Sequence, residues 1–425
     1  MKKSNIILFL SLLLCGCRQE IISSIDSSGE STSSLTSEIS SIFDSEPSSS
    51  SSSEKVSSSK SEDISSIVSS SGESSSSEET KQTLSIGEVL SLGQTLSEGE
   101  ESEVIKFEGL YVKALTDNFD KLMLFVDNDN YVFVRVEGGF DDYLKNRYLS
   151  CRYTVEGNVT KSNGNIEVNY QNITNLTSEQ EEYDYSNISL NKNSIEEVYQ
   201  EINNVNLNNK DTGVGKIVTF EAVIVASDED DSNTKVVAYD EQNVITVIDD
   251  KTICSKNDMG QKYIFTGVIS VLKTSPAIML LDKEYVEKVN LDEVSYSNAE
   301  EVVPSYFSKW YYTSNKQSKP TLDVYKTLYK ITGYVIEDSS RTSKYYLGVV
   351  DEKGHSLADN GITTSIKGVY LMNNLNMDDY DLTYSPFYEH YINEEKVTFY
   401  ASFYQFDTNN HGWKVFALNN TISLA

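Results

Sequence analysis

The sequence predicts an all-β protein in which one five-stranded unit occurs three times in tandem. The first indication is a spaced pair: an apolar residue opens a strand-like run, and an aspartate follows twenty residues later. The pairs are Phe107 and Asp127, Phe220 and Asp240, and Ile331 and Asp351, which sets repeat intervals of 113 and 111 residues. A chain of 425 residues accommodates about three domains. Spacing and length together predict one domain in three copies.

A short helix is expected at the start of each copy. In all three, a residue with a capping oxygen stands three positions before a glutamate, which is the signature of a capping box. The pairs are Ser85 and Glu88, Ser194 and Glu197, and Asn298 and Glu301. The sequence therefore predicts a capped helix before every set of strands.

Five β-rich runs follow the helix in a common order, which is typical of a small all-β unit. In the first copy they are Val104–Val112, Leu122–Val126, Tyr131–Val136, Tyr148–Val159 and Ile166–Tyr170. In the second they are Ile217–Val225, Lys235–Tyr239, Val244–Ile248, Tyr263–Val271 and Ile278–Leu281. A helical turn is expected at Phe140–Lys145, between the third and fourth strands of the first copy.

Glycines and aspartates fit this arrangement. Gly109 and Gly157 fall in the middle of the first and fourth strands, where a position without a side chain allows a barrel strand to bend sharply. The corresponding positions hold Ala222 and Gly267 in the second copy, and Gly333 and Ala401 in the third. The three repeated aspartates fall in the hairpin between the second and third strands, where Asp favours a turn.

These features resemble a known module. A capped helix, strands such as Phe107-Glu108-Gly109 and Val155-Glu156-Gly157, and an acidic hairpin are similar to the OB-fold modules found in tandem in bacterial surface proteins, some beside secreted nucleases. The resemblance covers residues 85 to 425 and implies OB-like barrels at 85–178, 194–292 and 293–425, the last divergent and rich in tyrosine. It carries no catalytic residue.

The resemblance also implies a binding face. OB-folds bind ligands on the face of the second and third strands. In the first copy this points to Phe125, Tyr131, Phe133 and Arg135. Because alternate strand residues face the core, Phe125 and Phe133 also fit a packing role, and Tyr131 with Arg135 is the better surface pair.

The first 17 residues read as an export signal. Lys2 and Lys3 precede an apolar run from Ile6 to Leu14 that is too short to span a bilayer permanently. The run ends Leu14-Cys15-Gly16-Cys17, which resembles the lipobox of bacterial lipoproteins. By this resemblance Cys17 is lipidated, and the protein is anchored on the extracellular face of a bacterial cell membrane. An ordinary signal peptide is the alternative.

Residues 18 to 84 are dominated by serine, with runs such as Ser48–Ser53. So few apolar residues cannot offset the entropy lost on ordering the chain, so this segment is expected to be a disordered stalk.

Charge and motifs argue against several classes of function. The net charge is -30 and no copy is basic, so general nucleic-acid affinity is disfavoured. No sequence signature of a hydrolase, a phosphate loop or a paired Cys/His metal site is present. Cys151 and Cys254 are interpreted as buried apolar residues. We therefore expect no enzyme activity, no cofactor and no metal.

The third copy differs in its aromatic content, with 24 of the chain's 45 aromatic residues. It also carries an insertion, Leu371–Glu395, that contains Tyr384 and Tyr388. Tyrosine suits contacts with sugars and proteins, and a packing role is equally compatible. Trp413 follows a turn-like Asn409-Asn410-His411-Gly412 segment, so it is expected to be exposed.

The sequence thus predicts a lipid-anchored extracellular binding protein without catalytic activity, with a glycan or protein ligand held by Tyr131, Arg135, Tyr384, Tyr388 and Trp413. The alternative is a nucleic-acid-binding or nuclease-accessory surface protein, which rests on fold analogy. A solute-capturing lipoprotein usually needs a two-lobed α/β fold, so the strand repeats oppose that third possibility.

Overall fold

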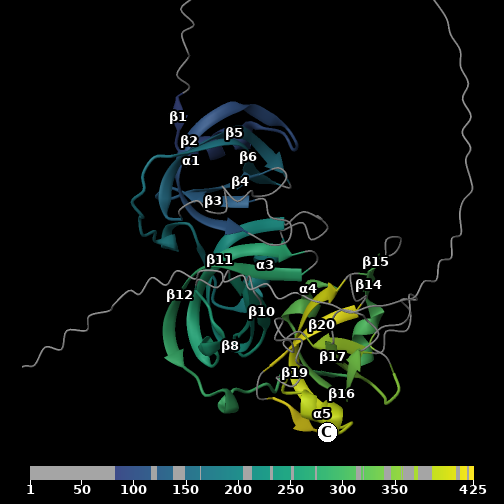
Figure 1. The fold of residues 1–425 in the computed structure, drawn as a ribbon. Helices are drawn as coiled ribbons and strands as arrows, with labels where there is room; N and C mark the ends of the chain where they lie inside the picture. Colours follow the sequence, from purple (N-terminus) through teal and green to yellow (C-terminus); the bar gives the residue numbers. More distant parts are fainter. Residues whose placement is uncertain are drawn as a thin grey trace, which may run out of the picture. The chain divides into compact units, whose positions relative to one another are not determined.

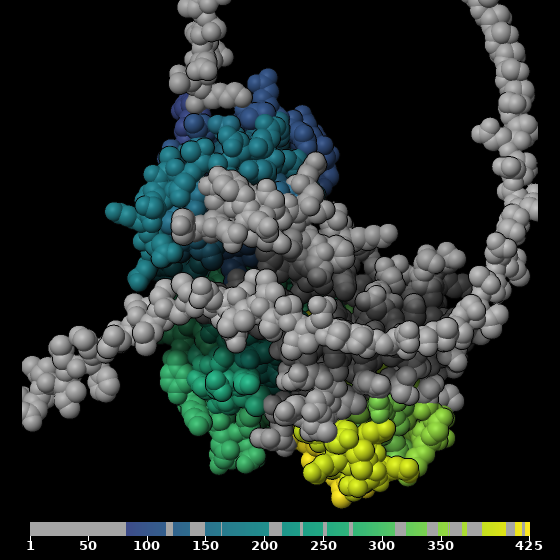
Figure 2. All heavy atoms as spheres, viewed as in Figure 1, coloured from purple at the N-terminus to yellow at the C-terminus, as the bar shows by residue number. Residues whose placement is uncertain are grey.

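The computed structural model describes residues 82–115, 122–136, 149–162, 164–203, 213–229, 233–249, 253–272, 275–312, 317–318, 320–338, 346–355, 357, 368–371, 385–407, 412–418 and 421–425. They belong to one compact unit, Ser77–Ala425. Figure 1 draws them in colour as a ribbon and Figure 2 as spheres in the same view. The expected signal peptide with Cys17, the serine-rich segment and the helical turn Phe140–Lys145 lie outside these residues.

The first barrel is built from β2 to β6, with a short parallel strand and a helix before them (Figure 1). The sheet order is β1-β2-β3-β4-β6-β5, and pairing of β2 with β5 closes the barrel. The elements are β1 (Thr83–Leu84), α1 (Ile86–Thr95), β2 (Glu101–Leu115), β3 (Leu122–Val126), β4 (Tyr131–Arg135), β5 (Cys151–Ser162) and β6 (Asn165–Asn175).

The second barrel repeats this topology, with β8 paired to β11 at the closure. Its elements are η1 (Tyr185–Asn187), β7 (Leu190–Asn191), α3 (Ile195–Ile202), β8 (Gly213–Glu229), β9 (Thr234–Tyr239), β10 (Val244–Asp249), η2 (Lys256–Asp258), β11 (Gln261–Leu272) and β12 (Ser275–Lys288). β10 and β12 are parallel, as β4 and β6 are in the first barrel.

The third sheet follows the same order from β16 to β20, and β16 also pairs with β19. Its elements are η3 (Leu291–Glu293), β13 (Glu300–Val302), η4 (Pro304–Lys309), β14 (Tyr311–Tyr312), β15 (Gln317–Ser318), α4 (Leu322–Lys326), β16 (Leu328–Asp338), β17 (Tyr346–Val350), β18 (Gly368–Leu371), α5 (Tyr388–Ile392), β19 (Lys396–Asp407), β20 (Gly412–Ala417) and β21 (Ser423–Leu424). The prediction of an all-β chain of tandem OB-like barrels is confirmed.

Two of the three expected helix caps are present. The Ser85 side chain accepts a hydrogen bond from the Glu88 amide, and the Glu88 carboxylate accepts one from the Ser85 amide at 2.8 Å. Ser194 caps α3 by accepting from the amide of Glu197 at 3.3 Å, but here the glutamate carboxylate accepts from the amide of Asn193, at 3.0 Å, rather than from that of Ser194. A capping oxygen satisfies an amide at the helix start that has no partner within the helix.

The capped helix expected at Asn298 is wrong. Residues Glu300–Val302 form β13, which pairs in parallel with β16 as β1 does with β2. The residue after β13 is Val303, which has no capping oxygen, and the six-residue 3-10 helix η4 follows it with Pro304 in its first turn. In this copy, the pattern of a capping oxygen three residues before a glutamate therefore falls on a strand, one element before the helix.

Two repeated aspartates connect the hairpin to the helix that precedes the strands. Asp240 Oδ2 accepts a hydrogen bond from the Ile195 amide, the first residue of α3, at 2.6 Å. Asp351 Oδ1 accepts one from the Ser305 amide in η4 at 2.8 Å. Asp127 closes its own hairpin turn through the amide of Asn130 at 2.9 Å. The repeated aspartate is thus a structural residue.

Glycines produce the sharp bends that the sequence predicts at the fourth strand. The register of β5 with β6 shifts at Gly157, and that of β11 with β12 shifts at Gly267. A Cβ atom at Gly157 would lie 2.2 Å from the carbonyl oxygen of Asn169, and one at Gly267 would lie 2.7 Å from that of Met279. Only glycine fits so close to a neighbouring strand.

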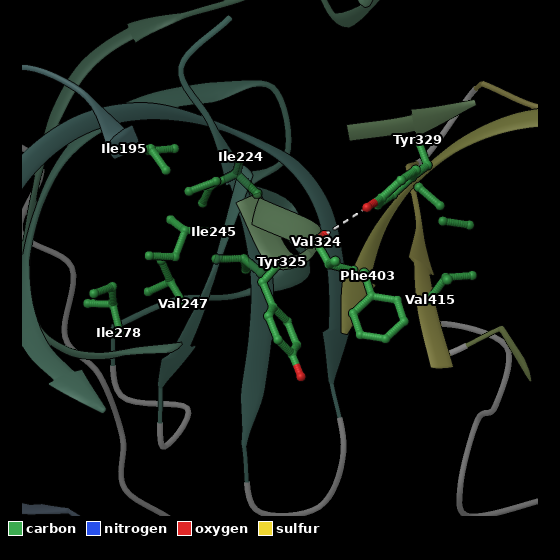
Figure 3. Close-up of a cluster of buried hydrophobic side chains, with 14 of the residues drawn as sticks. Ile195, Ile224, Ile245, Val247, Ile278, Val324, Tyr325, Tyr329, Phe403 and Val415 are labelled. Atoms are coloured by element: carbon green, nitrogen blue, oxygen red, sulfur yellow. Dashed lines mark hydrogen bonds between the residues drawn. The ribbon is translucent and has the colours of Figure 1, made fainter. Parts of the chain in front are cut away.

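Inward-facing strand residues form the cores. The first barrel has its own cluster around Phe107, Phe125 and Tyr153, all fully buried. The cores of the second and third barrels are continuous, because α4 contributes to both. Figure 3 shows Val324 and Tyr325 of α4 between residues of β10 and Phe403 of β19, and the rings of Tyr325 and Phe403 are 5.2 Å apart.

Candidate binding surfaces

Strand β4 holds the surface pair that the sequence predicts. Val132 and Val134 point into the core of the first barrel, so Tyr131, Phe133 and Arg135 lie on its outer side. All three are nevertheless largely covered: Phe133 is buried, and Tyr131 and Arg135 are half-buried. The outward direction is as predicted, but a free ligand face is not what the structure has at this position.

Phe125 on β3 is fully buried and packs in the core against Phe107, with ring centroids 5.9 Å apart. Of the two interpretations left open for this residue, the packing role is correct.

The second barrel covers this outer side of the first. One buried apolar cluster joins residues from both barrels: Leu110, Val112, Leu115, Leu122, Leu124, Val126 and Phe133 from the first, with Ile217, Ile248, Val268, Ala277, Met279 and Leu281 from the second. Burial raises the pKa of Tyr131, whose hydroxyl also meets the backbone of Ile217. Removing this much apolar surface from water is the main favourable term for such a junction.

The charged groups on this side are paired. Arg135 donates to Glu167 from Nε at 2.5 Å and from a terminal nitrogen at 3.0 Å, and Glu167 is only 2% exposed. Lys113 Nζ lies 3.7 Å from Asp249 Oδ1 of the second barrel, and both side chains are buried. The Asp249 carboxylate also accepts hydrogen bonds from the amides of Ile253 and Cys254.

The third barrel covers the same side of the second. Val225, Ala226, Val237, Tyr239 and Val244 of the second barrel form a buried cluster with Leu328, Tyr404, Phe416 and Leu418 of the third. Tyr296, in the segment between these barrels, packs against Tyr239 and Tyr400 with centroids 5.6 and 5.0 Å away.

Strand pairing shows that the two junctions use equivalent positions. We define the tail face of a barrel by outward positions that pair across its first three strands. They are Leu110, Val126 and Tyr131 in the first barrel, Val223, Tyr239 and Val244 in the second, and Tyr334, Val350 and Gly368 in the third. In both junctions, tail-face residues of one barrel contact the next barrel.

We define the head face by outward positions that pair across the first, fourth and fifth strands. They are Val104, Asn158 and Asn169 in the first barrel, Ile217, Val268 and Met279 in the second, and Leu328, Ser402 and Phe416 in the third. Each junction therefore joins the tail of one barrel to the head of the next.

The head face of the first barrel is polar. Asn158 donates to the carbonyl of Ser102 at 2.7 Å, and Asn169 donates to the Glu101 carboxylate at 2.7 Å. Gln171 donates to Asn158 Oδ1 at 2.6 Å. These side chains satisfy one another and remain in contact with water, so this face closes the series of junctions. Polar outer faces on terminal repeats serve the same purpose in other tandem proteins.

The predicted exposure of Trp413 is wrong. Its side chain is 2% exposed, its indole N–H donates to the carbonyl of Trp310 at 2.8 Å, and its ring packs against Phe403 at 4.9 Å. Trp413 and Val415 alternate along β20 and both face the core. Proximity to a turn did not indicate which face of the strand the ring takes. Much of the aromatic excess in this barrel fills its interior, as with Phe307, stacked on Phe403 at 5.3 Å.

The other two tyrosines predicted for the third copy have different outcomes. Tyr384 lies outside the described residues. Tyr388 is half-buried at the start of α5, with its ring 6.2 Å from that of Tyr391. Tyr391 donates to Glu337 at 2.8 Å, and this bond, followed by burial, raises the pKa of its hydroxyl. On this side of the barrel Ile392 is 58% exposed.

The structure adds residues that the sequence pattern did not single out. On the tail face of the third barrel, the half-buried Tyr334 ring has Lys353 Nζ at 5.6 Å and Lys396 Nζ at 5.7 Å from its centroid. Lys353 also pairs with Glu394 at 2.9 Å. These residues could have been found from the sequence, because Tyr334 and Ile336 alternate with core residues of the same strand and therefore face outward.

Nucleophile and metal chemistry receive no support from the cysteines. Cys151 and Cys254 are both buried, as predicted, and burial raises the pKa of each thiol, that of Cys254 to about 12. A reactive cysteine needs the opposite shift. Within the described ranges, no three His, Cys, Asp or Glu side chains gather in a way that could hold a metal ion.

No helix in this part of the chain is long and apolar enough to cross a membrane.

No protein-family model matches the chain, and no curated protein matches it. Among solved structures, it is similar to the hypothetical protein ygiW from E. coli, with 16% identity over 22% of this chain and 90% of that chain and a TM-score of 0.17. It is similar to the Ifi202 HINa domain in complex with 20-bp dsDNA, with 14% identity, coverage of 46% and 99%, and a TM-score of 0.23. For the tetrameric p202 HIN2 the values are 10%, 45% and 96%, and 0.22. The fold assignment rests on the strand pairing of this chain.

Proposed function

We propose that the chain is a lipid-anchored extracellular binding protein without catalytic activity, which presents its third barrel to a glycan or protein ligand. One observation carries the proposal. The tail faces of the first and second barrels, which are the faces that OB-folds commonly use for ligands, are covered by the next barrel. Among the described residues, the equivalent face of the third barrel packs against Leu357 of the same barrel rather than against another barrel.

Two further features support binding through the third barrel. Tyr334 and Tyr388 are half-buried aromatic rings, and Ile392 is an exposed aliphatic side chain. Aromatic side chains provide large contact areas at low entropic cost, both for sugars and for proteins. The buried thiols with raised pKa values, together with the lack of catalytic motifs in the sequence, support a role without catalysis.

The anchor is supported by the sequence alone, through the lipobox-like Leu14-Cys15-Gly16-Cys17. A Cys17→Ser variant is expected to leave the membrane fraction and to lose labelling by palmitate in a bacterial host. Cys15→Ser is the matched control and should keep both properties. Palmitate labelling that persists in Cys17→Ser would exclude Cys17 as the lipidated residue.

The ligand class is tested with the compact unit Ser77–Ala425 on glycan, protein and DNA arrays at two salt concentrations. Binding to a glycan or a protein that changes little with salt supports the proposal. Binding to DNA that falls steeply with salt would instead favour the nucleic-acid alternative, because phosphate contacts release counterions. Arg135, the basic residue of the predicted binding face, and Lys113 on the same side of the barrel are already paired with acids, which makes this second outcome the less expected one.

A further inference from the structure

The tail face of the third barrel differs from the other two at two positions. Gly348 and Gly368 stand where the first barrel has Leu124 and Tyr131. The second barrel has Val237 and Val244 there. Two large side chains are therefore missing on one side of the third barrel, and the strand pairing around them is unchanged. A hollow is expected at this place.

Leu357 fills the hollow. A Cβ atom at Gly348 would lie 2.3 Å from Leu357 Cδ2, and one at Gly368 would lie 2.9 Å from the same atom. Each would also lie 2.6 Å from a backbone oxygen of the neighbouring strand, that of Val369 for Gly348 and that of Val349 for Gly368. Leu357 is 2% exposed, and it forms a small apolar cluster with Val350 and Tyr370, which are fully buried. Tyr334 and Ile336 are half-buried and pack against this cluster. The two glycines and the leucine therefore fit one another.

The connection that carries Leu357 is itself unusual. In the first two barrels the second and third strands are joined by four-residue hairpins, Asp127–Asn130 and Asp240–Asn243. In the third barrel β17 ends at Val350 and β18 begins at Gly368. The longer connection places an aliphatic side chain of the same barrel where the other barrels receive side chains of their neighbour.

We infer that this hollow is a docking pocket for an aliphatic side chain of a partner protein, and that Leu357 occupies it when no partner is bound. The inference rests on the proposed function and narrows its ligand from a glycan or a protein to a protein. Both internal junctions place apolar side chains of another barrel on the tail face, and Leu357 shows that a leucine fits this one. The hydrophobic side chains packed around Leu357 are Val350, Tyr370, Tyr334 and Ile336, which favours an aliphatic group over a sugar.

The partner is a different protein rather than a second copy of this chain docked in the same way. A second copy would have to offer the head face of its first barrel, which carries Asn158, Asn169 and Gln171 in place of the Val268, Met279 and Leu281 of the second barrel. Placing these amides, and the Glu101 carboxylate that accepts from Asn169, in an apolar junction would remove them from water, which is costly above all for the carboxylate.

The test uses a fluorescent peptide with the sequence of residues 351–367 and the full chain carrying Leu357→Ala. The peptide is expected to bind this variant saturably and about ten-fold more tightly than the unaltered chain, whose own Leu357 competes. The same peptide with alanine at the Leu357 position should bind the variant about ten-fold more weakly, because burying a leucine side chain supports a factor of this size. Anisotropy titration measures both affinities.

Two further variants keep the test decisive. Ile336→Ala shortens a side chain that packs against the Leu357 cluster and should weaken binding of the peptide, whereas Val303→Ala, at an exposed position of the same barrel, should not. If Leu357→Ala does not fold, Leu357→Val replaces it, with the leucine peptide still expected to bind more tightly than the alanine peptide. Equal binding of the two peptides, or no saturable binding, overturns the inference. Array ligands whose affinity is unaffected by Leu357→Ala would leave the proposed function standing and would overturn this pocket alone.

Discussion

The tail faces of the first and third barrels occupy the same positions in the same strand pairing, and they differ in what covers them. In the first barrel, Leu124 and Tyr131 reach out to meet the second barrel. In the third, Gly348 and Gly368 leave room for a leucine of the barrel itself. One backbone arrangement thus serves as a junction or as a hollow. The choice is made by two side chains and a longer hairpin.

The head faces give a parallel comparison, since that of the first barrel is polar and those of the second and third are mainly apolar.

The largest expected effect follows from separating the barrels. A fragment of residues 194–292 would expose an apolar head and an apolar tail, whereas residues 85–178 would expose only a tail. We expect the first fragment to aggregate or bind a hydrophobic dye strongly, and the second to be more soluble. Size-exclusion chromatography compares them. Two equally soluble monomers would contradict the importance of the junctions.

Equivalent head-face residues allow a matched pair of substitutions. Phe416 is fully buried in the junction between the second and third barrels, so Phe416→Ala is expected to lower the free energy of unfolding by about 3 to 5 kcal/mol. Asn169→Ala, at the same position of the first barrel, should cost only about 0.5 kcal/mol, as is usual on the surface. Urea denaturation of the full chain measures both. Similar costs for the two changes would show that the faces are not as different as their burial indicates.

The ion pairs offer a comparison of smaller size. Lys113 and Asp249 are both buried at the first junction, so Lys113→Met removes the cation beside a buried carboxylate and is expected to cost about 3 kcal/mol. Arg152 and Glu181 pair at 2.8 Å with about 40% of each side chain exposed, and Arg152→Met should cost about 1 kcal/mol or less. The midpoints of urea unfolding measure the difference. A Lys113→Met chain as stable as the Arg152→Met chain would contradict a buried junction.

Much of the fold could be predicted from the sequence because it depends on local patterns. The run Leu122–Val126 was assigned with the bounds that the structure has, and the caps at Ser85 and Ser194 require only two residues at a fixed spacing. The bends at Gly157 and Gly267 follow from the absence of a side chain within a strand. At Asn298 the same spacing gave a wrong prediction of a helix, because the pairing of β13 with β16 is non-local and outweighs a weak helix signal.

The candidate site was harder to predict, since it depends on which barrel faces which. Alternation along β4 gave the direction of Tyr131 and Arg135 but not what lies opposite them. One usable signal was missed: Leu122–Val126 is apolar throughout rather than alternating, as expected of a strand covered on both sides. The hollow at Gly348 can be recognised only when the cross-strand partner of each residue is known. No local pattern gives that.

The smallest expected effect lies outside the head and tail positions and separates the stability of a barrel body from that of the junctions. Burial opposes ionisation of Asp258, but the hydrogen bond from Lys283 and the amide of Ser255 outweigh it, and the pKa of this carboxyl is lowered. A carboxyl with a lowered pKa in the folded state adds stability that is present in full above its unfolded pKa of about 3.9 and is lost as the pH falls through the folded value.

Asp258→Asn should therefore lower the free energy of unfolding at neutral pH, by less than Phe416→Ala or Lys113→Met does. It should also reduce the loss of stability on acidification. Asp292→Asn, at an exposed acid, is the matched control and should destabilise the chain less at neutral pH than Asp258→Asn. Identical acid profiles for Asp258→Asn and the unaltered chain would show that the pair with Lys283 contributes nothing, and that acid acts elsewhere.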